Sequence, residues 1–230
     1  MAADQQTTAA LRLHASRIHL LLLNYFGKPD WHHPLPAVDE LISTILSQNT
    51  NDQNRDRAFT QLRSQFNTWE EVRDAPTEKV IAAIRSAGLA QRKAPRIQQV
   101  LRSITDQRGK IELDFLKELP PEQASQWLQQ FNGVGPKTAA IVLLFTLNQP
   151  AFPVDTHIQR VTKRLGLIPP STTAEQAHRI LAETFEPNDY GVDHLNLISL
   201  GREICQARKP KCEICPLQNE CEYFQDHHHI

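Results

Sequence analysis

The apolar residues of this chain recur mostly at three- and four-residue intervals, the spacing that places side chains on one face of an α-helix. Leu11, Ile18 and Leu22 show this spacing, and a mostly apolar run from Val38 to Leu46 predicts a buried helix. No segment shows the two-residue alternation that indicates a strand. The pattern predicts an all-α protein, with helices at about residues 7–25, 38–46, 53–66, 78–86, 93–108 and 190–205, another that ends near residue 185, and a pair flanking residues 131–135.

Residues that favour helix ends mark several of the boundaries. The segments Thr68–Glu71 and Thr172–Glu175 match the capping box, in which a threonine and a glutamate satisfy backbone N–H groups at the start of a helix. Gly88 stands where a helix is expected to stop. Residues 26–36 are rich in proline, histidine and glycine, which predicts an extended loop.

A glycine turn separates two of the predicted helices. It reads Gly133-Val134-Gly135 and is followed by Pro136 and Lys137. Glycine permits positive φ values and close approach of other groups, and proline fits the first turn of a helix. Backbone N–H groups left unpaired at such a helix N-terminus form an anion site. The turn therefore predicts contact with the phosphates of a nucleic acid.

Length and composition narrow the possible classes of protein. The 230 residues allow one large domain or two small ones. Because 25 lysines and arginines are balanced by 26 aspartates and glutamates, a nucleic-acid partner must be met by a local patch of positive charge. No stretch approaches the roughly 18 apolar residues of a membrane span. We therefore expect a cytoplasmic protein without a membrane partner.

All four cysteines lie near the C-terminus, as Cys205, Cys212, Cys215 and Cys221. A cytoplasmic chain does not readily hold disulfides, so clustered thiols predict a metal or redox site. Four thiolates suit either a [4Fe–4S] cluster or a zinc ion. Zinc ribbons usually pair two C-x2-C knuckles, and this chain has one, which favours the iron–sulfur cluster. Four buried structural thiols are the remaining alternative.

Three motifs together resemble the endonuclease III family of DNA glycosylases, in the helix-hairpin-helix-GPD superfamily. They are the segment 133–139, the segment 154–158 (Val-Asp-Thr-His-Ile) and the C-x6-C-x2-C-x5-C pattern. The resemblance spans nearly the whole chain. It implies an all-α, two-lobed fold, with a six-helix barrel carrying the hairpin at residues 38–149 and a [4Fe–4S] domain made of residues 1–37 plus 150–230. It also implies a monomer that acts on double-stranded DNA containing a damaged base or an abasic site.

The resemblance assigns catalytic roles to two residues. Lys137 would attack C1′ of the damaged nucleotide and form a Schiff base that permits β-elimination. Asp155 would help to deprotonate the amine and would stabilise positive charge on the sugar. Each has a plainer alternative, because a lysine early in a helix is often a solvated surface residue and aspartate is a good helix N-cap. DNA contacts are implied for Gly133, Val134, Gly135, Thr138 and His157.

Further DNA contacts are implied outside the hairpin. The damaged base must leave the stack before C1′ can be reached, and protein side chains must fill the gap. Gln48 matches the residue that probes the vacated space, and Leu89 matches an apolar wedge on the opposite strand. Arg92, Lys93 and Arg96 follow Leu89 on the basic helix and are expected to bind phosphate. The alternatives are a helix cap for Gln48, a helix-stop contact for Leu89 and a solvated face for the basic helix.

These features predict a base-excision repair glycosylase with abasic-site lyase activity, removing oxidised pyrimidines. One alternative is a monofunctional glycosylase for uracil or mismatched bases, which Lys137 argues against because monofunctional relatives usually carry another residue there. A second is a non-catalytic DNA-binding module with a structural or redox-sensing cluster. Pro136, Asn132 and Asn49 depart from the commonest family pattern. These departures affect the expected lesion preference more than the reaction type.

Overall fold

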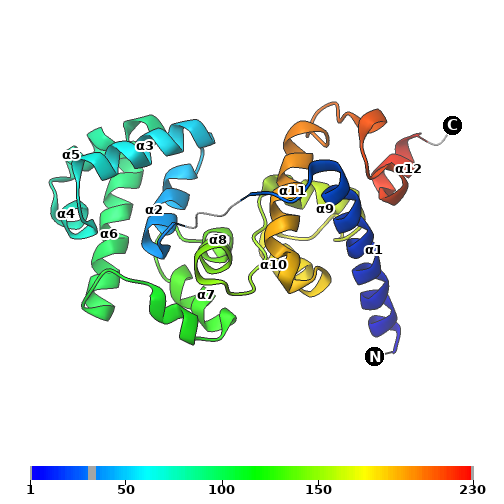
Figure 1. Ribbon diagram of the computed structural model, residues 1–230, viewed down its shortest axis with the longest axis horizontal. Helices are drawn as coiled ribbons and strands as arrows, with labels where there is room; N and C mark the ends of the chain where they lie inside the picture. Colours follow the sequence, from blue (N-terminus) through cyan, green and yellow to red (C-terminus); the bar gives the residue numbers. More distant parts are fainter. Residues whose placement is uncertain (1, 31–34, 229–230) are drawn as a thin grey trace. The chain divides into compact units, whose positions relative to one another are not determined.

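A computed structural model describes residues 2–30 and 35–228 of the chain. Within these residues every regular element is helical, with twelve α-helices, five short 3-10 helices and no β-strand (Figure 1). The chain forms two compact units, one of residues 33–149 and one of residues 1–32 with 150–230. None of the described helices combines the length and the apolar character needed to cross a membrane. The all-α prediction is confirmed.

The unit of residues 33–149 contains helices α2 to α8. In it α2 packs against α3 and α8, α6 packs against α4 and α5, and α7 packs against α8. The bounds are α2 Ala37–Ser47, α3 Asp52–Gln65, α4 Trp69–Asp74, α5 Thr77–Ala83, η1 Arg85–Ala87, α6 Ala90–Arg108, η2 Asp114–Glu118, α7 Pro121–Gln129 and α8 Pro136–Leu147.

The pairing of α2 with α8 sets the position of the glycine turn. Leu41 and Ile45 of α2 are fully buried, as are Val142 and Leu143 of α8. Each side chain of this size contributes roughly 1.5–3 kcal/mol when it leaves water. Because α8 is fixed along its length by this contact, the turn at its N-terminus is held on a rigid support.

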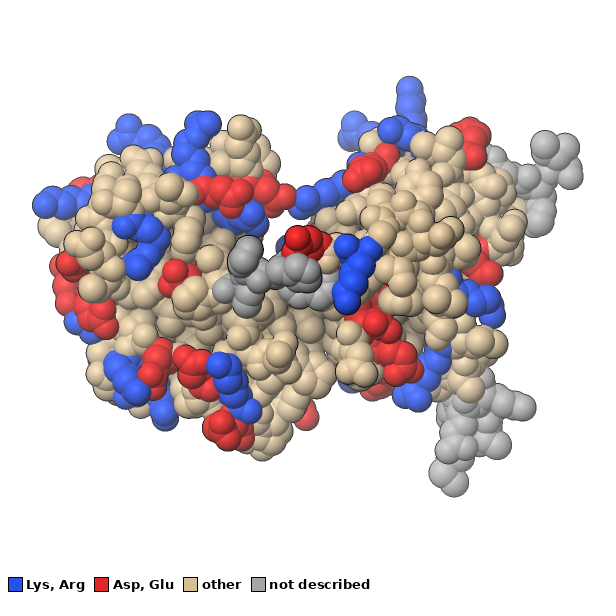
Figure 2. Space-filling view, in the orientation of Figure 1, with Lys and Arg blue, Asp and Glu red and all other residues tan. Residues whose placement is uncertain are grey.

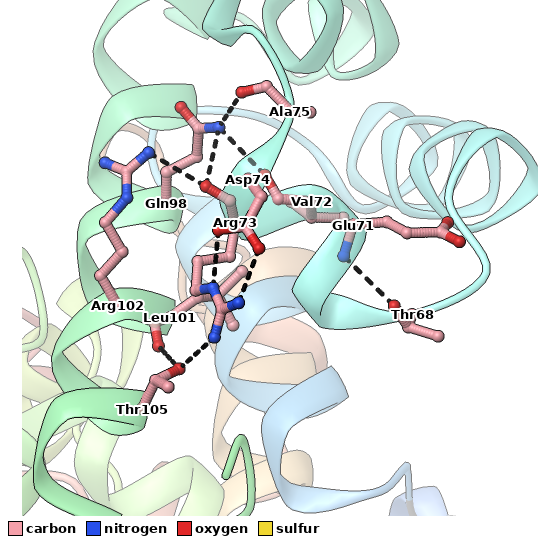
Figure 3. A network of polar contacts seen from close by, with 10 residues as sticks. All are labelled: Thr68, Glu71, Val72, Arg73, Asp74, Ala75, Gln98, Leu101, Arg102 and Thr105. Atoms are coloured by element: carbon pink, nitrogen blue, oxygen red, sulfur yellow. Dashed lines mark hydrogen bonds and ion pairs between the residues drawn. The ribbon is translucent and has the colours of Figure 1, made fainter. Parts of the chain in front are cut away.

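A polar network joins α6 to the end of α4 (Figure 3). Gln98 is buried, and its Nε2 donates to the carbonyl oxygens of Val72 at 3.0 Å and Ala75 at 2.8 Å. Its Oε1 accepts from the hydroxyl of Thr77 at 2.7 Å. The last carbonyls of a helix have no partner within the helix, so Gln98 satisfies them and fixes α4 and α5 on α6.

The unit of residues 1–32 with 150–230 is built around α11. This helix packs against α1 and α9, and its buried polar residues reach α1. Asp193 Oδ1 lies 2.8 Å from Nδ1 of His19, and Asn196 donates to the carbonyl of Gly27 at 3.2 Å. The bounds are α1 Ala2–Phe26, α9 Thr156–Arg164, α10 Ala174–Thr184, η3 Pro187–Asp189, α11 Tyr190–Glu203, η4 Cys212–Ile214, η5 Gln218–Glu220 and α12 Glu222–His228.

Both predicted capping boxes need correction, although the predicted start of α4 is confirmed. The capping box of α10 is formed by Thr173 and Gln176, one residue later than predicted. Thr172 is buried and its N–H is bonded to the carbonyl of Pro169 in the preceding turn, so the helix begins after it. At α4 the side chain of Thr68 accepts from Glu71 N as predicted, but Glu71 Oε2 accepts from Asn67 N.

The other boundaries are close to the predictions. Helix α6 begins at Ala90, three residues before the expected start, and ends where Gly109 adopts a φ of 74°. Gly88 follows η1 with a φ of 69° and acts as the predicted stop. Residues 31–34 of the predicted loop lie outside the described residues.

Candidate functional site

The glycine turn joins α7 to α8 as predicted. Gly133 has a φ of 84°, a value that favours glycine, whereas Gly135 has an ordinary φ of −96°. Val134 is 4% exposed, and its N–H donates to the carbonyl of Phe131 at 3.0 Å. The expectation of several unpaired N–H groups is therefore wrong for Val134. This residue anchors the turn in the core.

A close approach explains the need for glycine at position 133. A Cβ there would lie 2.3–2.7 Å from Cδ, Nε and Cζ of Arg96. The carbonyl of Gly133 accepts from Gln48 Nε2 at 2.9 Å, and Gln48 Oε1 accepts from Arg96 Nη1 at 3.2 Å. The turn is thus joined by side chains to α6 and to the residue that ends α2.

The candidate nucleophile lies at the start of α8. Pro136 is the first residue of this helix and Lys137 the second, with its side chain partly exposed. The neighbouring Thr138 is buried, which counts against the DNA contact expected of its side chain. The sequence thus predicted where Lys137 lies.

The candidate carboxylate begins a helix of the other unit. Asp155 is the N-cap of α9, and its Oδ1 accepts from Ile158 N at 2.8 Å. The capping role that the sequence left as an alternative is therefore present. Capping uses Oδ1, and a carboxylate has a second oxygen with which to accept a proton. A cap and a proton acceptor are compatible in one side chain.

Lys93 is the clearest correction among the predicted DNA contacts. Its side chain is 2% exposed, and Nζ donates to the carbonyls of Leu46 at 2.7 Å and Ala87 at 2.8 Å. Burial, followed by the charge of Arg96, lowers the pKa of Lys93 from 10.5 to about 8. A phosphate outside the protein cannot reach this ammonium group. Lys93 instead satisfies carbonyls at the ends of α2 and η1.

Leu89 has the exposure expected of a wedge. Its side chain is 49% exposed, and its φ of 49° is left-handed. A non-glycine residue in this region costs roughly 1–2 kcal/mol. Strain of this kind is concentrated at functional positions. The conformation places an apolar side chain in solvent at the start of α6, which fits the predicted role better than a simple helix-stop contact.

His157 is held by neighbours that the sequence did not single out. Its Nδ1 accepts from Arg160 Nη2 at 3.2 Å, and its Cβ would lie 2.9 Å from a Cβ at Gly201. Arg160 also donates to the carbonyls of Gly201 and Cys205, at 2.8 Å and 3.0 Å. Arg160 therefore connects His157 to the first cysteine.

The four cysteines surround one cavity. Cys205 follows α11, Cys212 begins η4, Cys215 directly follows it, and Cys221 precedes α12. All four line the cavity and none forms a disulfide. Among the described residues, no three His, Cys, Asp or Glu side chains are arranged to hold a single metal ion. Four thiols around a shared cavity supply the ligand set of either a [4Fe–4S] cluster or one zinc ion.

Arg164 completes the lining of this cavity, and sequence reasoning missed it. Its Nη1 donates to Cys205 Sγ at 3.2 Å, and its guanidinium lies over the ring of Tyr223, 4.7 Å from the centroid. Burial raises the pKa of Cys215 to about 11 and also raises the pKa of Cys221, so these thiols hold their protons until a cation replaces them. The signal for Arg164 was its spacing from Arg160, since residues four apart share one helix face.

The surface charge agrees with the near-zero net charge. Figure 2 shows lysine and arginine interspersed with aspartate and glutamate over the visible face of each unit. Three cations, Arg208, Lys209 and Lys211, lie between the first two cysteines. All three are exposed, which makes them candidates for the local positive patch expected from the sequence.

Known proteins match both the region that contains the glycine turn and the loop that contains the cysteines. The model of the HhH-GPD superfamily of base excision DNA repair proteins matches residues 42–187, and that of the iron–sulfur binding domain of endonuclease III matches residues 205–221. Endonuclease III of Thermotoga maritima is 34% identical over 185 residues, covering 80% of this chain and 82% of that protein. The DNA glycosylase/AP lyase ROS1 of Arabidopsis thaliana is 33% identical over 173 residues, 68% of this chain but 12% of that protein.

A solved structure extends the similarity. The trapped covalent intermediate of endonuclease III with DNA has a TM-score of 0.75 and 26% identity, and the match covers 96% of this chain and 97% of that one. The cysteine match assigns the cavity to a [4Fe–4S] cluster, held by the four thiolates. The chain belongs to the endonuclease III family, within the HhH-GPD superfamily of base excision DNA repair proteins.

Proposed function

We propose that this glycosylase is bifunctional, releasing a damaged base and then cleaving the DNA strand at the abasic site. The observation that carries the proposal is a partly exposed lysine, Lys137, in the first turn of the helix that follows the glycine turn. Support also comes from relatives, since the solved endonuclease III complex is a covalent protein–DNA intermediate and ROS1 is named as a glycosylase and lyase. We propose oxidised pyrimidines in double-stranded DNA as the substrates.

In the proposed reaction, the neutral amine of Lys137 attacks C1′ of the damaged nucleotide. The bond from C1′ to the base breaks, and the base leaves with the electron pair and takes up a proton. The carboxylate of Asp155 accepts the proton that the amine loses and offsets the positive charge on the sugar. The sugar ring opens as O4′ takes that proton back from Asp155, which leaves an iminium ion between Lys137 and C1′. Removal of a proton from C2′ then expels the 3′ phosphate, and hydrolysis frees the lysine.

The cluster supports this chemistry without taking part in it. When it is bound, it supplies four metal–thiolate bonds that fix residues 205–221 in one shape. Arg208, Lys209 and Lys211 of this loop would then contact DNA phosphates. The proposal assigns the loop to binding and the hairpin helix to the reaction.

Borohydride trapping on duplex DNA with one abasic site tests the proposal. Borohydride reduces an iminium ion to a stable amine, so wild-type protein should become covalently attached to the DNA. Lys137→Ala should abolish the adduct, while Lys117→Ala, which removes an exposed lysine of the same unit, should leave it unchanged. An adduct that survives in Lys137→Ala would assign the nucleophile to another amine. Base release without any adduct in the wild type would indicate a monofunctional glycosylase.

Base release from duplex DNA containing one oxidised pyrimidine examines Asp155. Asn accepts a backbone N–H as well as Asp does, so Asp155→Asn should keep the N-cap of α9 and the melting temperature. It cannot accept a proton, and base release should fall by about 10²–10⁴-fold. Asp155→Ala should show the same loss of base release with a lower melting temperature. Full activity in Asp155→Asn would limit this residue to capping.

A further inference from the structure

One amide side chain connects two of the elements expected to contact DNA. Gln48 follows α2, and its Nε2 donates to the carbonyl of Gly133 in the glycine turn at 2.9 Å. Its Oε1 accepts from Nη1 of Arg96, on α6, at 3.2 Å. The amide group of Gln48 therefore lies between a main-chain carbonyl and a guanidinium group, all within the unit of residues 33–149.

These two partners are chemically opposite. A primary amide has almost the same shape when it is rotated by half a turn, which exchanges its oxygen and its NH₂ group. The carbonyl of Gly133 can only accept hydrogen bonds and the guanidinium of Arg96 can only donate them. In the rotated state, oxygen would face oxygen and NH₂ would face guanidinium, so both hydrogen bonds would be lost. The surroundings thus select one orientation of the amide.

The contact depends on the glycine. The guanidinium carbon of Arg96 lies 2.7 Å from the position of a Cβ at residue 133, and Nε lies 2.4 Å from it. Any side chain at position 133 would force the end of the Arg96 side chain to move from the place where it bonds to Gln48. Lys93, one turn earlier on α6, donates to the carbonyl of Leu46 at 2.7 Å and so fixes the main chain two residues before Gln48. Helix α6 therefore controls both the backbone and the amide of this loop.

The locked amide keeps unused hydrogen-bonding capacity. One N–H of the NH₂ group and one lone pair of the oxygen remain after the two bonds are made, and the side chain is partly exposed. Arg96 and Gly133 fix which side of the amide presents the remaining N–H and which side presents the remaining lone pair. A group with a fixed order of donor and acceptor can distinguish among bases by their hydrogen-bonding edges, whereas a freely rotating amide fits either order.

We propose that Arg96 is a positioning residue that holds the amide of Gln48 in one orientation, so that Gln48 discriminates among the bases opposite the lesion. The inference rests on the proposed function, because it assigns the opposite-base preference of that same activity. The sequence places Arg96 on a basic helix that is expected to bind phosphate. In this proposal its guanidinium group instead orients a side chain of the protein. Arg92, exposed on the same helix, keeps the phosphate role.

The test compares base release under single-turnover conditions from duplexes with the lesion opposite each of the four bases. The wild type should show a spread of rates, and Arg96→Leu should reduce that spread by about fivefold, the value of one net hydrogen bond. Arg92→Leu should lower all four rates by a common factor. In a Gln48→Ala background, which has already lost the amide, Arg96→Leu should add no further change in the spread.

Three results would overturn the proposal. They are equal rates opposite all four bases in the wild type, an unchanged spread in Arg96→Leu, and an effect of Arg96→Leu that persists in the Gln48→Ala background. Melting temperatures of all variants establish that they are folded.

A second readout does not depend on activity. The side-chain NH₂ resonances of Gln48 in the free protein, identified by their loss in Gln48→Ala, should broaden or shift in Arg96→Leu and stay in place in Arg92→Leu. Unchanged Gln48 resonances in Arg96→Leu contradict the lock even if the enzyme is inactive. Absence of base release, with the expected resonance change, would refute the proposed function and leave the lock established.

Discussion

The glycine turn and the cysteine loop are both expected to bind phosphate, but different forces hold them in place. The turn has Val134 in the core, helices on both sides and Gln48 bonded to its carbonyl. In the loop of residues 205–221, by contrast, Leu217 is the one buried residue. The regular structure of this loop consists of two short 3-10 helices. A chain can hold a turn in place with its own core, whereas we expect a loop with so little apolar surface to depend on a ligand.

The largest expected effect is on the loop. Cys215→Ser, which removes a cluster ligand, should abolish the visible absorbance of the cluster and release residues 205–221. Amide hydrogen exchange in this loop should then approach that of an exposed segment, with an opening free energy of about 0 kcal/mol. Residues 33–149 should keep their protection.

A parallel experiment avoids mutation. Wild-type protein from which iron has been removed should show the same local loss, and reconstitution with iron and sulfide should reverse it. Equal protection of the loop with and without the cluster would mean that it is held by the protein, as the glycine turn is.

An intermediate effect is expected at the turn. Gly133→Ala must adopt a positive φ, at a cost of roughly 1–2 kcal/mol, and must also displace Arg96. Gly109→Ala is the matched control, because Gly109 has a similar φ of 74° and no atom within 4 Å of an added Cβ. Urea unfolding should show a larger loss for Gly133→Ala, and the excess should disappear in an Arg96→Ala background. If the two variants lost the same free energy of unfolding, the close approach of Arg96 to residue 133 would make no contribution to the stability of the turn.

A pH-dependent effect is expected at Lys93, which bonds to the carbonyl of Leu46 just before Gln48. Between pH 8 and 10.5 the unfolded chain holds a proton at Lys93 that the folded chain has lost, because burial lowers the folded pKa to about 8. The contribution of Lys93 to the free energy of unfolding should therefore increase as pH rises through that window, by at most about 1.4 kcal/mol per pH unit. Urea unfolding at pH 8, 9 and 10 should show this rise in the wild type and not in Lys93→Met.

Lys79→Met serves as the control for this measurement. It removes an exposed lysine from the same unit and should keep the rise. If Lys93→Met behaved like Lys79→Met, the ammonium group of Lys93 would not be the source of the pH dependence.

Local signals made much of the molecule predictable. The helical spacing, Gly88, Gly109 and the prolines mark boundaries because their preferences act within a few residues. The same holds for Lys137 and Asp155, whose places at helix starts follow from the neighbouring glycine, proline and threonine.

Contacts distant in sequence were not predictable in this way. Lys93 looks like part of a basic helix face, yet it bonds to Leu46, 47 residues earlier. Arg164 reaches Cys205 across 41 positions, and Gln48 reaches Gly133 across 85. A long cationic side chain suits solvent or a buried carbonyl equally well, so only the folded arrangement decides between them.

The division of the chain also has a consequence for the order of assembly. Residues 33–149 are continuous and can fold as soon as they are synthesised, since domains generally fold as units during translation. Helix α1 is made before this segment, while α11, to which it is joined through His19 and Asp193, is made after it. We therefore expect the unit that carries the cysteines to close last, and iron–sulfur loading to be a late event in maturation.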